Sequence, residues 1–202
     1  MDYKFFLYLI LPLSLFATEP INKINDQFQK AQSITQTYAK TEHLKKLTIS
    51  QATLKAINEA RSLNQICSRA TNPLRWNKGL YYHAKEHSID MAVNNKLSHM
   101  GSGTKTDITA QNLKLNRGSY FYERVNQKVN SKKILSGELI IRTTTNTLKG
   151  PRELIGYWLK NPNDCKVIMD SRYTDVALAK VISNKDNKAY WTLLLAGARA
   201  KK

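Results

Sequence analysis

The sequence is short of cysteine and of acidic residues, and it contains no internal repeat and no low-complexity tract. Cys67 and Cys165 are its only 2 cysteines, so a single intramolecular disulfide is the most that it can form. The sequence has 32 Lys and Arg residues but only 15 Asp and Glu residues, so its formal net charge is +17. The basic residues are scattered in short doublets and accompany no nucleic-acid-binding motif. The charge favours contact with polyanions such as anionic lipid or acidic polysaccharide, and nucleic acid is the least favoured of these partners.

The sequence also lacks an apolar run as long as a transmembrane helix, which needs roughly 20 apolar residues. The apolar run near the N-terminus, "FFLYLILPLSLF", follows Lys4 and is followed by Ala17. A base, a short apolar run and a small residue describe a secretory signal peptide. Residues 1–17 are predicted to be one, with an uncleaved anchor as the alternative. Removing them takes away one base and one acid, so the net charge of +17 is unchanged.

Export would place both cysteines in an oxidising compartment, where disulfides form and persist. A bridge between Cys67 and Cys165 would close a loop of about 100 residues and stabilise the fold by about 4 to 5 kcal/mol in the chain-entropy model. Two separate buried thiols are the alternative.

Hydrophobic spacing predicts a mixture of helices and strands after a polar segment, residues 18–48, that suits a linker or an extra N-terminal helix. The predicted elements are a helix over 52–63 with its N-cap at Ser50, a helix over 77–94, a loop with one short helix over 100–133, a strand over 136–145, a helix from near Pro151 to before Pro162, and a hairpin of strands over 175–183 and 189–196. This order favours an α+β fold over a regularly alternating α/β fold. Residues 49–202 are predicted to form one domain.

Three of the four histidines lie close together in the first half of the chain. His83, Glu86 and His87 spell the H-x-x-E-H pattern of one class of zinc peptidase. On a helix, however, His87 falls inside the apolar stripe and His83 at its edge. A zinc site also needs a third ligand, and the spacing selects neither Glu138 nor Glu153. The pattern favours a packed, hydrogen-bonded His87 on a core-facing helix, and a peptidase site is the weaker alternative.

The stretch that contains these histidines resembles the CAP superfamily, which comprises cysteine-rich secretory proteins, antigen 5 and plant pathogenesis-related proteins. The matching motifs, in chain order, are "AINEARSLNQIC", "LRWN", "AKEHSIDMA", "SHMG", "SGELI", "YWLKNPNDC", "YTDVALA" and "YWTLLLA". Together they extend over roughly residues 52–197 and look most like the small bacterial members. Several short motifs in the correct order are more specific than any one of them. The resemblance implies a three-layer α-β-α sandwich with a central antiparallel sheet, and it implies that the two cysteines pair.

The resemblance also implies a cleft lined by two histidines and two acidic residues, which holds a divalent metal in some members. His99 matches the first histidine and Glu138 one of the acids, whereas Asp164 stands in place of the second histidine. No acid follows Trp158 where the other one is expected. His99, Glu138 and Asp164 are therefore the candidate catalytic residues and the candidate ligands of a weakly bound divalent metal such as zinc. The favoured alternative is a structural hydrogen-bond network without metal.

The functional expectation is a monomeric, secreted or periplasmic binding module without catalytic activity and without a membrane anchor once the signal is removed. Its expected partner is an anionic envelope component, a lipid or a protein. The alternative is a hydrolase in which Glu138 acts as base or metal ligand and His99 as its acid–base partner. A nucleic-acid binder is the weakest candidate.

Overall fold

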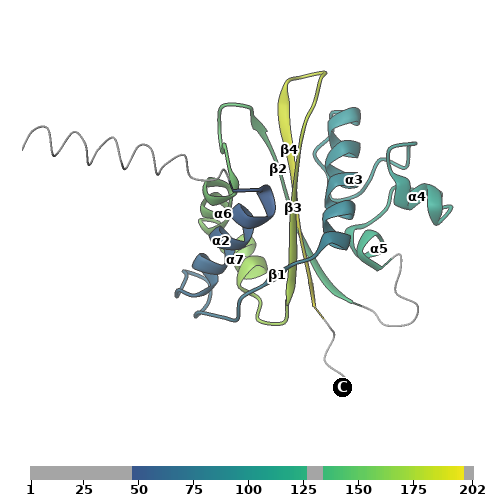
Figure 1. Cartoon of the computed structure of the whole chain (residues 1–202). Coiled ribbons are helices and arrows are strands. Elements are labelled where there is room, and N and C mark those ends of the chain that lie inside the picture. Colours follow the sequence, from purple (N-terminus) through teal and green to yellow (C-terminus); the bar gives the residue numbers. More distant parts are fainter. Residues whose placement is uncertain (1–46, 127–133, 198–202) are drawn as a thin grey trace, which may run out of the picture. The chain divides into compact units, whose positions relative to one another are not determined.

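The computed structural model describes residues 47–126 and 134–197, which fold as a three-layer α-β-α sandwich (Figure 1). The predicted signal peptide and nearly all of the predicted linker lie outside the described residues. The elements in chain order are α2 (Ile49–Arg61), β1 (Arg75–Trp76), α3 (Lys78–Asn94), α4 (Ile108–Asn112), α5 (Phe121–Asn126), β2 (Leu135–Thr144), α6 (Pro151–Leu159), α7 (Pro162–Met169), β3 (Asp175–Ile182) and β4 (Lys188–Gly197). Helices α2, α6 and α7 cover one face of the sheet, and α3 and α5 cover the other. The predicted fold class is confirmed.

The sheet has the strand order β1-β3-β4-β2. The predicted hairpin forms between β3 and β4, and β2 pairs antiparallel with the other side of β4. The two-residue strand β1 was not predicted, because so short a segment shows no alternation of apolar and polar residues. It pairs parallel with the start of β3, so the sheet is antiparallel in its three long strands and parallel at one edge.

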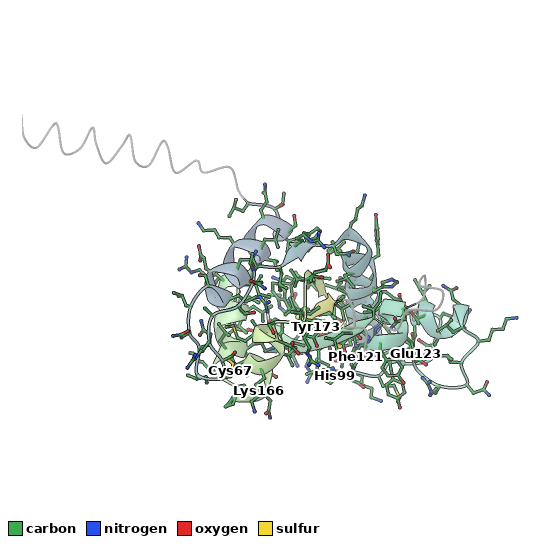
Figure 2. All side chains as sticks on the ribbon, turned by 90° about the horizontal axis from the view of Figure 1, so that it is seen from below. Cys67, His99, Phe121, Glu123, Lys166 and Tyr173 are labelled. Carbon is green, nitrogen blue, oxygen red and sulfur yellow. A yellow bond between two sulfur atoms is a disulfide. The ribbon has the colours of Figure 1, made fainter. Side chains whose placement is uncertain are left out.

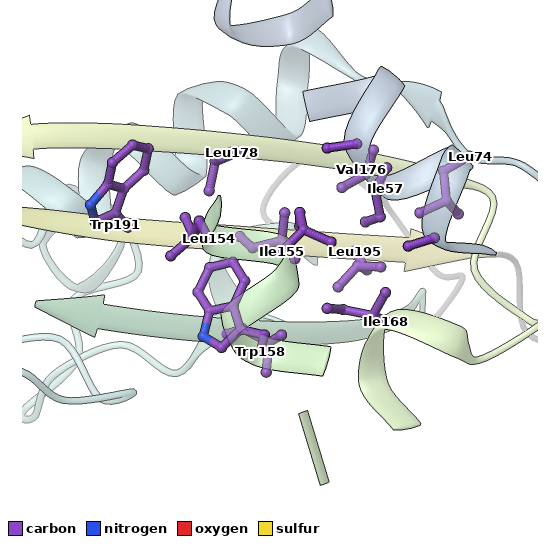
Figure 3. Close-up of a cluster of buried hydrophobic side chains, with 14 of the residues drawn as sticks. Ile57, Leu74, Leu154, Ile155, Trp158, Ile168, Val176, Leu178, Trp191 and Leu195 are labelled. Atoms are coloured by element: carbon purple, nitrogen blue, oxygen red, sulfur yellow. The ribbon is translucent and has the colours of Figure 1, made fainter. Parts of the chain in front are cut away.

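Strand β4 is buried along nearly its whole length because helices cover both faces of the sheet. Successive side chains of a strand point to opposite faces. Trp191 and Leu193 accordingly pack with Trp158 under α2, α6 and α7, in the larger core shown in Figure 3. Leu194 faces the other way and packs with Leu80 of α3. One strand thus joins two apolar cores, and each fully buried side chain of this size contributes about 1.5 to 3 kcal/mol.

Several helix boundaries differ from the prediction. Helix α2 begins after Thr48, and the predicted N-cap at Ser50 is wrong, because Thr48 and Gln51 form a reciprocal capping box. The helix ends at Arg61, so Leu63 lies beyond it and is 61% exposed. Residues 100–126 contain two short helices rather than one.

The helix predicted from Pro151 stops at Leu159, and a separate helix, α7, follows it. Asn161 caps α7 by accepting hydrogen bonds from the backbone N–H groups of Asn163 and Asp164. Pro162 occupies the first turn, where its missing N–H costs nothing. The proline that was expected only to end one helix therefore also begins the next.

The predicted disulfide is confirmed. Cys67, in the loop after α2, is bonded to Cys165 of α7, and the two Cα atoms are 5.9 Å apart. The fully buried Arg61 joins the same two segments, because its side chain donates to the carbonyl oxygens of Asn72 and Ile168. The loop and α7 are therefore held together by a covalent bond and by buried hydrogen bonds.

Candidate functional site

The centre of the candidate site is the carboxylate of Glu138 on β2. Its neighbour Leu139 packs into the core under α2, α6 and α7. Because side chains alternate along a strand, Glu138 points to the opposite face, toward α3 and α5. The side chain is fully buried, with 0% of it exposed. A buried carboxylate needs compensating partners. Two side chains supply them through hydrogen bonds, and a third, that of His87, lies beside the carboxylate.

These three partners come from separate parts of the chain. The imidazole Nδ1 of His99 lies 2.8 Å from Oε1 of Glu138. The guanidinium Nη2 of Arg124, on α5, lies 2.7 Å from Oε2. The imidazole Nε2 of His87, on α3, is 3.9 Å from Oε1. Both carboxylate oxygens are therefore engaged, one by an imidazole and the other by a permanent cation.

The surroundings keep Glu138 ionised. Burial raises the pKa of its carboxyl, but the hydrogen bond from His99 and the positive charge of Arg124 outweigh burial, and the pKa lies below its ordinary value. Because an ionised carboxylate only accepts hydrogen bonds, His99 must donate through Nδ1. In the neutral form of an imidazole that donates in this way, the other nitrogen, Nε2, carries a lone pair. The side chain of His99 is 59% exposed, so this nitrogen belongs to the accessible part of the site.

His87 has a different role from His99. Its side chain is 1% exposed, and Nε2 lies 2.8 Å from the carbonyl oxygen of Ser98, to which it donates. Burial and the charge of Arg124 lower the pKa of the imidazole below its ordinary value, against the opposing effect of Glu138. His87 is thus a neutral histidine, and it is packed and hydrogen-bonded as the position of its side chain on the helix predicted. It fixes the backbone immediately before His99.

The loop that carries His99 is held in place by two buried carboxylates. Asp90 of α3 accepts hydrogen bonds from the backbone N–H and the hydroxyl of Ser102. Asp107 accepts from the backbone N–H and the hydroxyl of Ser119. Short hydroxyl side chains suit this arrangement because they bond to carboxylates without filling the loop. The two ends of the segment between α3 and α5 are thereby fixed beside the site.

Gly118 lets the ends of this segment approach closely. A Cβ atom at Gly118 would lie 1.7 Å from the carbonyl oxygen of Gly101, which is closer than any real contact. Next to these glycines, the N–H of Gly101 donates to the carbonyl oxygen of Ser119 at 2.8 Å. The glycines in "SHMGSG" and "NRGS" therefore serve a close backbone contact that positions His99.

Arg124 connects this loop to Glu138. Its Nη1 donates to the carbonyl oxygen and hydroxyl of Ser119, and its Nη2 donates to the carbonyl oxygen of His99 as well as to Glu138. The side chain is 1% exposed. Its Nε is one of two buried polar side-chain atoms without a hydrogen-bond partner in the described part of the chain. The guanidinium thus ties the loop, α5 and β2 together.

Asp164, the third candidate residue, lies near the site but is not bonded to it. It belongs to the first turn of α7. Burial raises the pKa of its carboxyl above the ordinary value, and the charge of His99 offsets part of that rise. Among the described residues, neither His99 nor Glu138 forms a hydrogen bond or an ion pair with it. The structure therefore brings two of the three candidates into contact and leaves Asp164 at electrostatic range.

The residues of the H-x-x-E-H pattern do not converge. The Nδ1 of His83 lies 3.7 Å from Oε2 of Glu86, and Glu86 accepts a hydrogen bond from the backbone N–H of Thr109. Glu153 lies on α6, on the other face of the sheet, where it accepts from the backbone N–H of Lys149. Only His87 of this pattern reaches the candidate site.

A metal ion at Glu138 would have to share the carboxylate with His99 and Arg124. A structural or catalytic zinc ion takes three or four protein ligands. Within residues 47–126 and 134–197, no group of three or more His, Cys, Asp and Glu side chains is placed to hold an ion. The oxygens of Glu138 already accept from His99 and Arg124, which leaves Nε2 of His99 and the carboxyl of Asp164 to meet an ion. The weak zinc site stays a prediction.

Two members of the site were not identified from the sequence. His87 was assigned only to the core. Helical geometry shows on which side of the helix the residue lies, but it does not show which residues of other elements it contacts. Arg124 lies in a segment that was predicted as loop with one short helix, and no spacing marks it. Its contact with Glu138 spans 14 positions and depends on how α5 packs against β2.

The sequence and the fold were compared with those of known proteins. Residues 54–195 match the model of the cysteine-rich secretory protein family, CAP. No curated protein matches the sequence. Among solved structures, an outer surface protein from Borrelia burgdorferi is similar with a TM-score of 0.51 and 17% identity, over 72% of this chain and 90% of that one.

A second similar structure is an extracellular protein containing an SCP domain from Bacillus anthracis str. Ames. It has a TM-score of 0.51 and 18% identity, and the match covers 73% of this chain but only 40% of that one. At these identities the structures support the fold alone. The family model, in contrast, spans both cysteines, His99, Glu138 and Asp164, so the chain belongs to the CAP family of cysteine-rich secretory proteins.

Proposed function

We propose that this CAP protein is an exported binding module that associates with an anionic component of the cell envelope, a lipid or a protein, and that it has no catalytic activity. The observation that carries this proposal is the state of Glu138. Its two oxygens are occupied by His99 and Arg124 at 2.8 and 2.7 Å, and its pKa lies below the ordinary value. A general base needs access to its substrate and a pKa near the working pH. The side chain of Glu138 is 0% exposed and its pKa is lowered, so it meets neither requirement.

The charge of the chain supports an anionic partner. A formal net charge of +17 raises the local concentration of polyanions and accelerates their association. The binding energy of such a partner is electrostatic, so it weakens as salt screens the charges.

Export is supported by two observations. The N-terminal residues 1–17 have the composition of a signal peptide. The two similar structures are named as an outer surface protein and an extracellular protein. In the described part of the chain, no helix combines the length and hydrophobicity needed to cross a bilayer.

Co-sedimentation with lipid vesicles and with envelope fragments tests the proposal. The chain without residues 1–17 is expected to bind vesicles that contain phosphatidylglycerol and anionic envelope fragments, and to be released by NaCl. Vesicles of phosphatidylcholine alone are the control. Binding that is equal on neutral and anionic vesicles, or that is insensitive to salt, would contradict the proposal.

A hydrolase is the second candidate, and the exposed His99 favours it. Its Nδ1 is bonded to a buried carboxylate, which orients the ring, and the neutral form of an imidazole held in this way can accept a proton at Nε2. In the described residues, however, no serine or cysteine side chain is hydrogen-bonded to His99 as a nucleophile would be. A hydrolytic activity that a His99→Ala, Glu138→Gln double variant lacks would establish this candidate over the first, whereas activity that survives in the variant would rule it out.

A further inference from the structure

A hollow of about 400 Å³ lies beside the disulfide, between the loop that follows α2 and the C-terminal end of α7. Figure 2 shows Cys67 and Lys166, one from each wall, close together on the underside of the molecule. The volume is within the range of sites at which proteins bind small molecules. We call this hollow the disulfide pocket, and its polar lining consists of Ser68, Arg69, Thr71, Lys166, Asp170 and Ser171.

The polar lining offers hydrogen-bond donors that are not used within the fold. Arg69 and Lys166 are exposed, and in the described part of the chain neither side chain forms an ion pair or a hydrogen bond. The hydroxyl groups of Ser68, Thr71 and Ser171 likewise have no partner among the described residues. Two cations and three hydroxyls from both walls are therefore free to meet one ligand.

The single carboxylate of the lining already has a cation. Asp170 accepts hydrogen bonds from Nε and Nη2 of Arg172 and from the backbone N–H of the same residue. These bonds hold the pKa of its carboxyl below the ordinary value. Asp170 is therefore engaged by Arg172 and leaves the charges of Arg69 and Lys166 unpaired.

A fifth basic group, neither exposed nor part of the lining, lies directly behind the wall of the pocket. Arg61 is fully buried, and its guanidinium donates to the carbonyl oxygens of Ile168 and Asp170 at the end of α7. Its own carbonyl oxygen accepts from the backbone N–H of Thr71. Its Nη2 has no hydrogen-bond partner in the described residues. Because solvent screens a buried charge less than an exposed one, Arg61 adds to the positive potential at the pocket.

The walls of the pocket are rigid. The disulfide joins them covalently. Within the loop, the backbone groups of Gln65 and Ser68 bond to each other in both directions, and the N–H of Ala70 donates to the side chain of Asn64. A site whose walls are already fixed loses little conformational entropy when a ligand binds.

We propose that the disulfide pocket binds a phosphate ester group. The inference rests on the proposed function and specifies the chemistry of the anionic partner. Arg69 and Lys166 meet the charge of the phosphate, and charge-assisted bonds of this kind are strong. The hydroxyls of both walls donate to the remaining phosphate oxygens, of which a carboxylate has fewer. No lining residue is aromatic, so the pocket offers a nucleobase no stacking surface.

Titration with glycerol 3-phosphate, followed by NMR and calorimetry, tests the inference. The chain without residues 1–17 is expected to bind this ester saturably. Arg69→Gln with Lys166→Gln is expected to bind it about tenfold more weakly, because two charge-assisted contacts are lost. The matched control is Lys55→Gln with Arg152→Gln, which removes the same charge from exposed positions of α2 and α6 that line a different hollow. It is expected to bind like the parent.

Two outcomes of this titration would overturn the inference. One is the absence of saturable binding of glycerol 3-phosphate to the parent. The other is an equal loss of affinity in the two double variants, which would mean that the overall charge and not the pocket attracts the ester. Thermal unfolding of all three proteins verifies that the fold is intact.

Vesicles that contain phosphatidylglycerol identify the carrier of the phosphate. If glycerol 3-phosphate releases the parent from these vesicles, and Arg69→Gln with Lys166→Gln binds them more weakly than the control variant, the pocket takes a lipid headgroup. If that variant loses glycerol 3-phosphate but binds the vesicles as the control does, the pocket takes a soluble or polymeric ester. Both results support the inference.

The same measurements separate the inference from the proposed function. If the parent and both variants bind anionic vesicles equally in a salt-sensitive manner and none binds glycerol 3-phosphate, the inference fails while the proposed function stands. If the parent binds neither anionic vesicles nor envelope fragments, the proposed function fails, whatever its affinity for glycerol 3-phosphate.

Discussion

His99 and Glu138 lie 39 positions apart in the chain, yet Nδ1 of the first is 2.8 Å from Oε1 of the second. This contact joins the loop after α3 to the middle of β2, and Arg124 spans the same two segments through its bonds to the His99 backbone and to Glu138. The exposed imidazole is therefore oriented by a buried ion pair. The stability of the site depends mainly on the buried pair of Arg124 and Glu138 and less on the imidazole of His99, which is exposed to solvent.

The first prediction concerns the buried ion pair. Replacing Arg124 by Met is expected to destabilise the protein by about 3 to 5 kcal/mol, because it leaves the buried carboxylate of Glu138 without its cation. The free energy of unfolding in urea measures this loss. Adding Glu138→Gln to the variant removes the unpaired charge and is expected to restore part of the stability.

The control for this prediction is Arg117→Met. Arg117 pairs with Glu123, but its side chain is 42% exposed, so the pair is screened by solvent and contributes little to stability. Equal destabilisation by the two variants would show that Arg124 has no special role in the site.

The second prediction concerns pH. The pKa of His87 lies below its ordinary value of 6.5, mainly because of burial. Below pH 6.5 the imidazole is therefore protonated in the unfolded chain more than in the folded chain. This difference lowers the stability of the fold as the pH drops below 6.5. The pKa of Glu138 lies below 4.5 despite burial, because of His99 and Arg124, so its contribution is present above pH 4.5 and is lost as the pH falls further.

Urea unfolding at a series of pH values checks the second prediction. Two successive losses of stability are expected on acidification, and a His87→Gln variant is expected to lack the upper one. A protein whose stability is constant between pH 8 and pH 5 would contradict the assignment of His87 as a buried neutral histidine.

Sequence reasoning succeeded where a signal is local or where motifs match in order. Helix α3 begins at Lys78, one residue after its predicted start, and β3 and β4 form the predicted hairpin. The family motifs located His99 and Glu138 and the two cysteines that pair. Arg124 was missed because its partners are distant in sequence. The spacing of residues along the chain does not show which two charged side chains will be buried next to each other. The strand β1 was missed because the start of β3, rather than its own two residues, determines its pairing.

The third prediction concerns the disulfide. Replacing Cys67 and Cys165 together by Ser is expected to lower the free energy of unfolding by about 4 kcal/mol, because the bond joins residues separated by 98 positions and restricts the unfolded chain. Urea unfolding of the oxidised and serine forms measures the difference. A smaller loss, within about 1 kcal/mol, would mean that the buried bonds of Arg61 hold the loop and α7 together without the bridge.

The fourth prediction concerns the loop that carries His99. Gly118→Ala is expected to destabilise the protein by about 3 kcal/mol and to shift the NMR signals of the His99 imidazole, because the new Cβ would lie 1.7 Å from the carbonyl oxygen of Gly101. Gly156→Ala is the matched control. Gly156 lies in α6 with nothing within 4 Å of a new Cβ, so alanine is expected to stabilise the protein by up to about 1 kcal/mol. If the His99 signals are unchanged in Gly118→Ala, Gly118 does not help to position His99.

The fifth prediction concerns metal. Zn²⁺ is expected not to remain bound to the purified protein in stoichiometric amount, because Glu138 already accepts from His99 and Arg124 and the positive charge of Arg124 repels a second cation. Metal analysis after gel filtration and titration calorimetry with Zn²⁺ measure this directly. His99→Ala is the reference, since it removes the accessible imidazole and leaves the Arg124–Glu138 pair in place. If the parent retains one zinc ion per chain and His99→Ala retains none, then the ion displaces Arg124 from Glu138 or uses Asp164, and the metal-free network is the wrong description of the site.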